Sequence, residues 1–177
     1  MNLKNYSVGD YSPGSKIKII LWMLISSIFI DTKFPWPSKL KRIILKSFGA
    51  KIGKGLVIKP RVWIKYPWFL EIGNYTWIGR GVQIDNLCKV QIGSDVCISQ
   101  DVKILTGNHN FKLKTFDLIT SKININNGVW IGAYSIVLPG TIINQFAVLG
   151  AGSIIKGEIE ENKIYTTNSQ ITIKNRY

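Results

Sequence analysis

The chain has 177 residues, of which 46% are hydrophobic and 19% are charged. This length and composition fit one globular domain with a small appendage and exclude a disordered chain. Twenty-three Lys and Arg residues against ten Asp and Glu give a formal net charge of +13. Such a cationic surface favours anionic partners, but without a zinc-finger spacing or an aromatic RNA-binding motif we expect no nucleic-acid partner.

Positive charge is concentrated at the N-terminus. Residues 1–51 hold nine Lys or Arg and two Asp, a net charge of +7, so the other 126 residues carry only +6.

The two cysteines, Cys88 and Cys97, lie inside the repeat described below. Their placement does not indicate a disulfide framework and favours a reducing compartment, so we expect a cytoplasmic protein.

Residues 19–30 form an apolar run that only two serines interrupt. Crossing a bilayer takes about 20 apolar residues, so this run is too short for a transmembrane helix. The stretch 35–37, which contains two prolines, ends this first helix. A second helix begins at Ser38, which suits an N-cap, and ends at Gly49. We therefore expect residues 1–49 to form a helical, basic segment.

Two interpretations of this segment remain open. The helices could pack over the end of the following domain, or against a neighbouring subunit, and hide exposed strand edges there. Alternatively, they could form an interfacial anchor, with Trp22 and Trp36 at the level of the lipid headgroups and lysines on anionic lipid. The second interpretation would put the protein at the inner face of the cell membrane, in peripheral contact with it.

From Ala50 onward the sequence has a six-residue period. Isoleucine, valine or leucine recurs at positions 52, 58, 64, 72, 78, 84, 92, 98, 104, 125, 131, 137, 143, 149 and 155. Glycine often follows directly, and a small or β-branched residue usually comes four positions after the aliphatic one. Because both positions repeat together over most of the chain, the pattern indicates a repeat fold.

Each six-residue unit predicts a short strand and a turn, with the aliphatic side chain inside and the small residue in a crowded corner. Three units close one triangular coil, and successive coils stack about 4.8 Å apart. Two longer intervals, 64 to 72 and 84 to 92, each add two residues at the same corner. We predict an all-β solenoid, a parallel β-helix, over residues 50–160, and a C-terminal tail over residues 161–177.

The period fails between Ile104 and Ile125, where the interval is 21 residues, six plus an insertion of 15. The inserted loop, residues 106–122, contains His109, the only histidine in the chain. A lone histidine is usually structural, but insertions in solenoids often make the binding surface. Neutral imidazole can take the proton from an alcohol as its oxygen attacks a carbonyl, so we interpret His109 as a general base.

Along nearly its whole length the chain resembles the hexapeptide-repeat acetyltransferases, most closely the colanic acid biosynthesis type. The resemblance is carried by LKSFGAKIGKG (45–55), YPWFLEIGNYTWIG (66–79), IDNLCKVQIG (84–93), ISQDVKILTGNHNF (98–111) and GVWIGAYSIVLPGTII (128–143). It implies a left-handed parallel β-helix, a homotrimer, and acetyl-CoA bound as co-substrate between adjacent subunits. It also implies a sugar or other hydroxyl as acceptor, with His109 as the catalytic base.

Position by position, the resemblance implies acceptor contacts at Asp85 and Asn86, contacts to the pantetheine arm of CoA at Ala133, Gly150 and Ala151, and Lys156 towards the nucleotide end. The spacing agrees in part, because Ala133 and Ala151 are three units apart and so lie one above the other. However, small residues occupy the corners of any such helix, and Asp85 and Asn86 would equally suit an ordinary turn.

The surroundings of His109 leave two questions. Asn108 could orient the loop or the imidazole, and it also belongs to the expected acceptor site. The group that holds the ring could be Asp101, Asp117 or a backbone carbonyl. We expect no metal, because one histidine cannot supply the three-histidine zinc site found in carbonic anhydrases of related fold.

The C-terminus departs from the family pattern. Family members usually end in a segment resembling A-G-N-P-A followed by basic residues, whereas this chain reads YTTNSQITIKNRY, which keeps Asn168 and lacks the proline. Lys174 and Arg176 remain as partners for the phosphates of CoA.

We therefore predict an acetyl-CoA-dependent O-acetyltransferase acting on a sugar or a cell-surface glycan precursor. Transfer would be direct, in a ternary complex, with no acetylated intermediate on Cys88 or Cys97. Three alternatives remain: transfer from an acyl-carrier protein, transfer to another small acceptor, and a non-enzymatic scaffold at the membrane.

Overall fold

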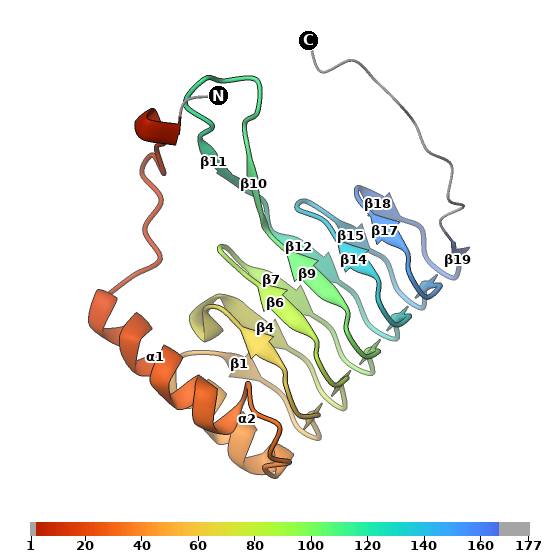
Figure 1. Ribbon diagram of the computed structural model, residues 1–177. Coiled ribbons are helices and arrows are strands. Elements are labelled where there is room, and N and C mark those ends of the chain that lie inside the picture. Colours follow the sequence, from red (N-terminus) through yellow and green to blue (C-terminus); the bar gives the residue numbers. More distant parts are fainter. Residues whose placement is uncertain (1–2, 167–177) are drawn as a thin grey trace.

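The structure, a computed structural model, describes residues 3–166. A short 3-10 helix, η1 (Leu3–Asn5), precedes two α-helices, α1 (Lys16–Phe29) and α2 (Ser38–Ser47). Short parallel strands then coil into a solenoid that runs away from the helices (Figure 1). The predicted parallel β-helix with an N-terminal helical segment is confirmed.

The solenoid has three faces, each a stack of parallel strands from successive coils. The first face contains β1 (Lys51–Ile52), β4 (Leu70–Ile72), β7 (Val90–Ile92), β12 (Ile123–Ile125), β15 (Ile142–Ile143) and β18 (Glu158–Ile159). The second contains β2 (Val57–Ile58), β5 (Trp77–Ile78), β8 (Cys97–Ile98), β13 (Trp130–Ile131), β16 (Val148–Leu149) and β19 (Ile164–Tyr165). The third contains β3 (Trp63–Ile64), β6 (Gln83–Asp85), β9 (Lys103–Leu105), β14 (Ile136–Val137) and β17 (Ile154–Ile155). The turns that follow these faces are the first, second and third corners.

The inward positions of the repeat form the core. Aliphatic side chains stack in register from coil to coil, so that Ile72 lies between Ile52 and Ile92. The small residues occupy the corners, and Thr76 and Ser135 among them are fully buried. Burying one isoleucine contributes about 1.5–3 kcal/mol, so the stack stabilises the whole length of the solenoid.

All three interruptions of the period fall at the third corner. The first contains the 3-10 helix η2 (Pro67–Phe69), the second contains residues 86–89, and the third is the long insertion at residues 106–122. The other two corners keep their register. The ladder also extends past residue 160, where the sequence suggested that a tail begins, because β19 pairs with β16.

The two helices cover the open end of the first coil (Figure 1). That end carries backbone groups that no preceding strand can pair. The indole Nε1 of Trp22 donates to the carbonyl oxygen of Ile64 (2.9 Å), and Nη1 of Arg42 donates to that of Gly53 (3.1 Å). The end-covering interpretation is thus confirmed. The placement of Trp22 among lipid headgroups is wrong, because its side chain is buried in the core.

Lys41 is a further donor to this strand edge. Its side chain is fully buried, and Nζ donates to the carbonyl oxygens of Ile58 (3.4 Å) and Lys59 (3.1 Å). Burial lowers the pKa of this ammonium group. The hydroxyl of Ser38 accepts the N–H of Ile58 (3.0 Å), so it bonds to β2 instead of capping α2 as the sequence suggested.

We expect Lys41→Met to lower the free energy of unfolding by about 1–3 kcal/mol, because methionine fills similar space but leaves buried carbonyl oxygens without a donor. Urea denaturation followed by circular dichroism measures the change. Lys39→Met, on the exposed side of the same helix, is the matched control and should change stability by less than about 0.5 kcal/mol. Equal stability of the two variants would contradict this account of the strand edge.

Candidate active site

The long insertion at the third corner folds into a β-hairpin that projects from the solenoid (Figure 1). Its strands are β10 (Gly107–His109) and β11 (Leu118–Thr120), which pair antiparallel with His109 opposite Leu118. The sequence predicted the insertion but not its hairpin form, because the usual two-residue turn signals are missing from it. Regular pairing fixes the direction in which the histidine side chain leaves the backbone.

The imidazole of His109 is held by Phe116. Nδ1 lies 3.1 Å from the carbonyl oxygen of Phe116, and the two rings stack at a centroid distance of 4.4 Å and an angle of 6°. Because a carbonyl oxygen can only accept, Nδ1 carries the proton of the neutral ring, and Nε2 is then the nitrogen with the lone pair. Of the orienting groups that the sequence left open, the structure selects the backbone carbonyl over Asp101 and Asp117.

The backbone around the ring has an unusual conformation. Phe116 has φ = +54°, in the left-handed region that non-glycine residues rarely occupy. Seven other non-glycine residues within residues 3–166 share this conformation, so it is a turn geometry of this fold, and at Phe116 it accompanies the carbonyl that faces His109. Asn108 is exposed, and its Oδ1 accepts the N–H of His109 at 2.8 Å, so it orients the strand rather than the ring.

The N-terminal segment ahead of α1 lies against the hairpin, a contact that the sequence did not suggest. The N–H of Leu118 donates to the carbonyl oxygen of Ser7 (3.2 Å), and the ring of Tyr6 lies 5.7 Å from that of His109. The hydroxyl of Tyr11 donates to the carbonyl oxygen of Leu87 (2.9 Å), and burial is the main cause that raises the pKa of this phenol. The segment therefore closes one side of the space beside the histidine.

A cavity of about 360 Å³ opens there. Its lining comes from the N-terminal segment, the third corner and the hairpin: Tyr6, Val8, Tyr11, Lys65, Tyr66, Asp85, Leu87, Gly107, Asn108, His109 and Leu118. The aromatic side chains, the carboxylate of Asp85 and the ammonium group of Lys65 suit a ligand that is a polar ring with several hydroxyl groups.

Asp85 and Asn86, expected together at the acceptor site, have different surroundings. Asp85 lines the cavity and forms an ion pair with Lys65 at 2.9 Å. Asn86 is fully buried, where its Oδ1 accepts the N–H of Tyr66 (3.0 Å) and its Nδ2 donates to the carbonyl oxygen of the same residue (2.6 Å). The expectation that Asn86 contacts the acceptor is therefore corrected: its amide is used to position Tyr66, which does line the cavity.

The residues expected to bind CoA lie elsewhere. Ala133, Gly150 and Ala151 are at the second corner, where the N–H of Gly152 donates to the carbonyl oxygen of Ala133 (2.8 Å) and so joins the two coils. Ala133 is half-buried and Ala151 is exposed. Within residues 3–166, neither of their own N–H groups has a hydrogen-bond acceptor.

Gly150 differs from the two alanines. Its N–H donates to Tyr165, and its carbonyl oxygen accepts from the hydroxyls of Ser135 (3.1 Å) and Ser153 (2.7 Å). Gly150 can contact a ligand, but it has no free backbone polar group to offer.

Lys156 is exposed at the third corner, between β17 and β18, and so lies on a different edge of the solenoid from the alanines.

One chain thus brings together only half of the expected site. His109 projects from the third corner, whereas the stacked alanines line the second corner. Asn168, Lys174 and Arg176 lie outside the described residues.

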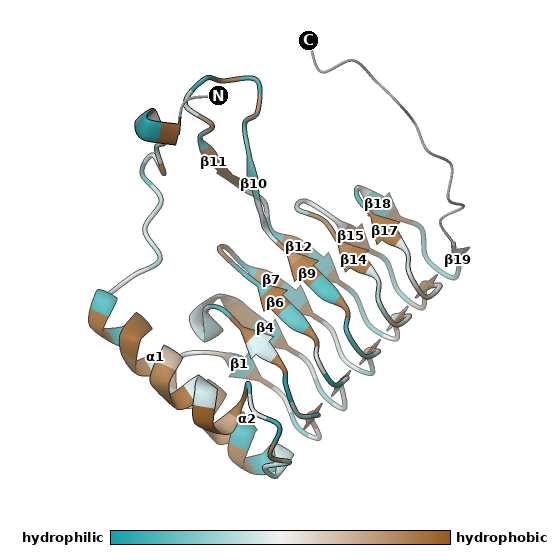
Figure 2. Ribbon diagram, viewed as in Figure 1, coloured by the Kyte–Doolittle hydropathy of each residue, from teal (hydrophilic) through white to brown (hydrophobic). Residues whose placement is uncertain are grey.

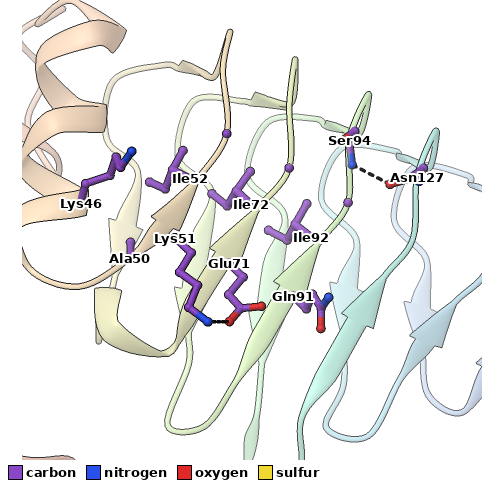
Figure 3. A pocket seen from close by; sticks show the side chains of 13 residues that line it. Lys46, Ala50, Lys51, Ile52, Glu71, Ile72, Gln91, Ile92, Ser94 and Asn127 are labelled. Atoms are coloured by element: carbon purple, nitrogen blue, oxygen red, sulfur yellow. Dashed lines mark hydrogen bonds and ion pairs between the residues drawn. The ribbon is translucent and has the colours of Figure 1, made fainter.

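A larger groove, of about 660 Å³, is shown in Figure 3, and His109 is not among the residues that line it. It runs along the first face and first corner, where Glu71 forms ion pairs with Lys51 and Lys89, both at 2.9 Å. Hydrogen bonding, chiefly from Lys51, lowers the pKa of the Glu71 carboxyl, which makes it a poor proton acceptor. The N–H of Ser94 donates to Asn127 Oδ1 (2.8 Å) as part of a ladder that ties the coils together. These contacts give the groove a structural role.

Cysteine chemistry finds no support at the candidate site. Cys97 lies on β8 of the second face, and burial raises the pKa of its thiol, which disfavours the thiolate. Cys88 is a free thiol at the third corner, where its N–H donates to the hydroxyl of Thr106 (3.3 Å).

Residues 3–166 contain no group of three or more His, Cys, Asp or Glu side chains arranged to hold a metal ion.

The chain is similar to named acetyltransferases. No family model matches it. A colanic acid biosynthesis acetyltransferase by name, WcaF of Escherichia coli (strain K12), is 34% identical over 180 residues, covering 99% of this chain and 97% of that protein. Galactoside O-acetyltransferase of the same organism is 29% identical over 133 residues, covering 72% of this chain and 66% of that protein.

Solved structures show the same fold. A hexapeptide-repeat acetyltransferase from Vibrio cholerae, complexed with acetyl coenzyme A, aligns with a TM-score of 0.77 at 16% identity and covers 93% of this chain and 91% of that one. A galactoside acetyltransferase in complex with coenzyme A aligns with a TM-score of 0.77 at 23% identity, covering 89% and 80%. With the near-complete match to the colanic acid biosynthesis relative, these findings show that the chain belongs to the hexapeptide-repeat acetyltransferases.

Proposed function

We propose that the protein transfers acetyl from acetyl-CoA to a hydroxyl of a sugar or of a cell-surface glycan precursor, with His109 as the general base. The observation that carries this proposal is the hydrogen bond between Nδ1 of His109 and the carbonyl of Phe116. In the neutral ring this bond assigns the lone pair to Nε2, and the ring lines a cavity with aromatic and charged walls. A base needs both properties, a free lone pair and access to the acceptor.

The reaction balances without a covalent enzyme intermediate. The acceptor hydroxyl donates a hydrogen bond to Nε2 of His109 and attacks the thioester carbon while its proton moves to the ring. The tetrahedral oxyanion, met by a backbone N–H of the facing coil, then collapses and breaks the C–S bond. The imidazolium returns the proton to the departing thiolate, which gives free CoA and the acetyl ester.

The two halves of the site belong to neighbouring copies in this proposal. Ala133 and Ala151 form a track of small residues whose two N–H groups have no acceptor within residues 3–166, which suits the thin, amide-containing pantetheine arm. Because that track and His109 are on different corners of one chain, a second chain must bring its histidine to the track. A closed homotrimer satisfies this with three identical sites, each made by two subunits.

The chemistry of the cavity supports a sugar as the acceptor. Tyr6 and Tyr66 offer aromatic surfaces, and the ion pair between Lys65 and Asp85 offers a donor and an acceptor for hydroxyl groups. The names of the two Escherichia coli relatives, which refer to colanic acid biosynthesis and to galactosides, point to the same class of acceptor. We also propose that the enzyme works at the inner face of the cell membrane, on a glycan carried by lipid.

His109→Ala should abolish acetyl transfer, with a loss of about 100-fold or more in kcat, because general base catalysis contributes about that much. Binding of CoA, measured by isothermal titration calorimetry, should stay within about twofold, since the base does not hold the donor. Release of free CoA in the presence of a panel of sugars measures the turnover. A variant that transfers acetyl at the wild-type rate would rule out the proposed base.

Tyr6→Ala should raise the KM for the acceptor several-fold while the KM for acetyl-CoA stays unchanged, because the ring lines only the acceptor cavity. The effect corresponds to an aromatic contact of about 0.5–1.5 kcal/mol. Tyr75→Ala, which removes an exposed tyrosine from the first corner, is the matched control. If both variants kept the wild-type acceptor KM, the N-terminal segment would have no part in acceptor binding.

A further inference from the structure

Helix α1 is apolar on two opposite sides. Its inner side contacts the solenoid through Trp22 and Ser26, which are buried. Most of its ribbon in Figure 2 is nevertheless coloured as hydrophobic, whereas α2 carries several hydrophilic positions. Packing on the solenoid therefore accounts for only part of the apolar character of α1.

Five further apolar residues form an outer stripe: Ile17, Ile20, Leu21, Leu24 and Ile28. They are between 51% and 71% exposed. Their spacing of three or four residues puts them on one side of the helix. Contiguous apolar surface of this kind on a water-soluble fold marks a contact with another molecule or with a membrane.

The charged residues near α1 indicate which kind of molecule contacts the stripe. Residues 16–46 contain seven Lys or Arg and one acidic residue, Asp31. Lys41 is buried, but Lys16 on α1, Lys33 after it, and Lys39 and Lys46 on α2 are exposed. Two such stripes from identical chains would bring like charges together, whereas an anionic surface would pair with them.

The shape of the segment fits a surface contact. No helix in the described part of the chain has the length and apolar character that a bilayer crossing requires. A helix with an exposed apolar stripe and flanking lysines instead lies in the plane of the membrane interface, with its apolar side chains between the headgroups. Phe34, 57% exposed just after α1, extends the apolar surface at the end of the helix.

Helix α1 is also close to the acceptor cavity, through a side other than the stripe. A groove of about 300 Å³ between α1 and the third face is lined partly by Met23, Lys65 and Tyr66. Lys65 and Tyr66 also line the cavity beside His109. A membrane in contact with α1 would therefore lie next to the opening through which an acceptor reaches the base.

We propose that the outer stripe of α1 docks the enzyme on an anionic lipid bilayer. The purpose of docking rests on the proposed function, since it would present a lipid-carried glycan to His109. In a cyclic trimer all three copies of α1 lie at the same end of the assembly, so three weak contacts act together.

Flotation with lipid vesicles tests the proposal. Purified wild-type protein should float with vesicles of phosphatidylethanolamine and phosphatidylglycerol and not with pure phosphatidylcholine, and salt should weaken the binding. Leu24→Glu should lower the bound fraction on the order of tenfold, because it puts a charge among the headgroups. Ile164→Glu, with the same change at a 76% exposed position on β19 at the far end of the solenoid, should bind as the wild type does.

Two outcomes would overturn the proposal. One is a wild-type protein that does not float with anionic vesicles. The other is a Leu24→Glu variant that floats as well as the wild type. Light scattering on the same samples shows whether Leu24→Glu splits the oligomer; a split oligomer together with absent flotation would assign the stripe to a subunit contact. Acetyl transfer to a free sugar is measured in parallel, so that a failure of docking is distinguished from a failure of the proposed function.

Discussion

The backbone ladder between successive coils is the interaction on which the rest of the structure depends. Strands of two or three residues pair with their counterparts one coil away, as Trp77 pairs with both Val57 and Cys97. Each coil thereby supplies the hydrogen-bond partners of the next, and only the end coils need other partners. At the N-terminal end, side-chain donors from α1 and α2 supply them. The same ladder lets one corner project a hairpin without disturbing the other two.

This separation of corners shapes the chemistry. The hairpin can hold His109 rigidly because its base is anchored between two paired coils, and the carbonyl of Phe116 then fixes which ring nitrogen carries the proton. The stacked alanines of the second corner keep the coil spacing, which suits a long ligand laid along the solenoid axis. In the proposed function, the acetyl donor and the base therefore belong to two different edges of the solenoid, and association of copies would join them.

Much of this arrangement could be predicted from sequence because the repeat is local and regular. The six-residue period predicts the faces, the core and the corner that takes the insertions, and it singles out His109. Contacts between distant segments carry no such period. Tyr11 and Leu87, which share a hydrogen bond, are 76 positions apart. The sequence suggests that Trp22 lies at a membrane interface, whereas its indole donates a hydrogen bond to the first coil. Asn86 likewise looks like an exposed turn residue, although its amide is consumed by one backbone segment inside the corner.

The central claim is that each active site combines the histidine of one subunit with the alanine track of another. Mixing subunits tests it most directly: chains carrying His109→Ala and chains carrying Ala151→Trp are each inactive alone if the account is right. Random mixed trimers at equal proportions would then regain about a quarter of the wild-type activity, because one site in four pairs an intact histidine with an intact track. Mixed trimers that stay inactive, although shown by mass to contain both chains, would contradict the account.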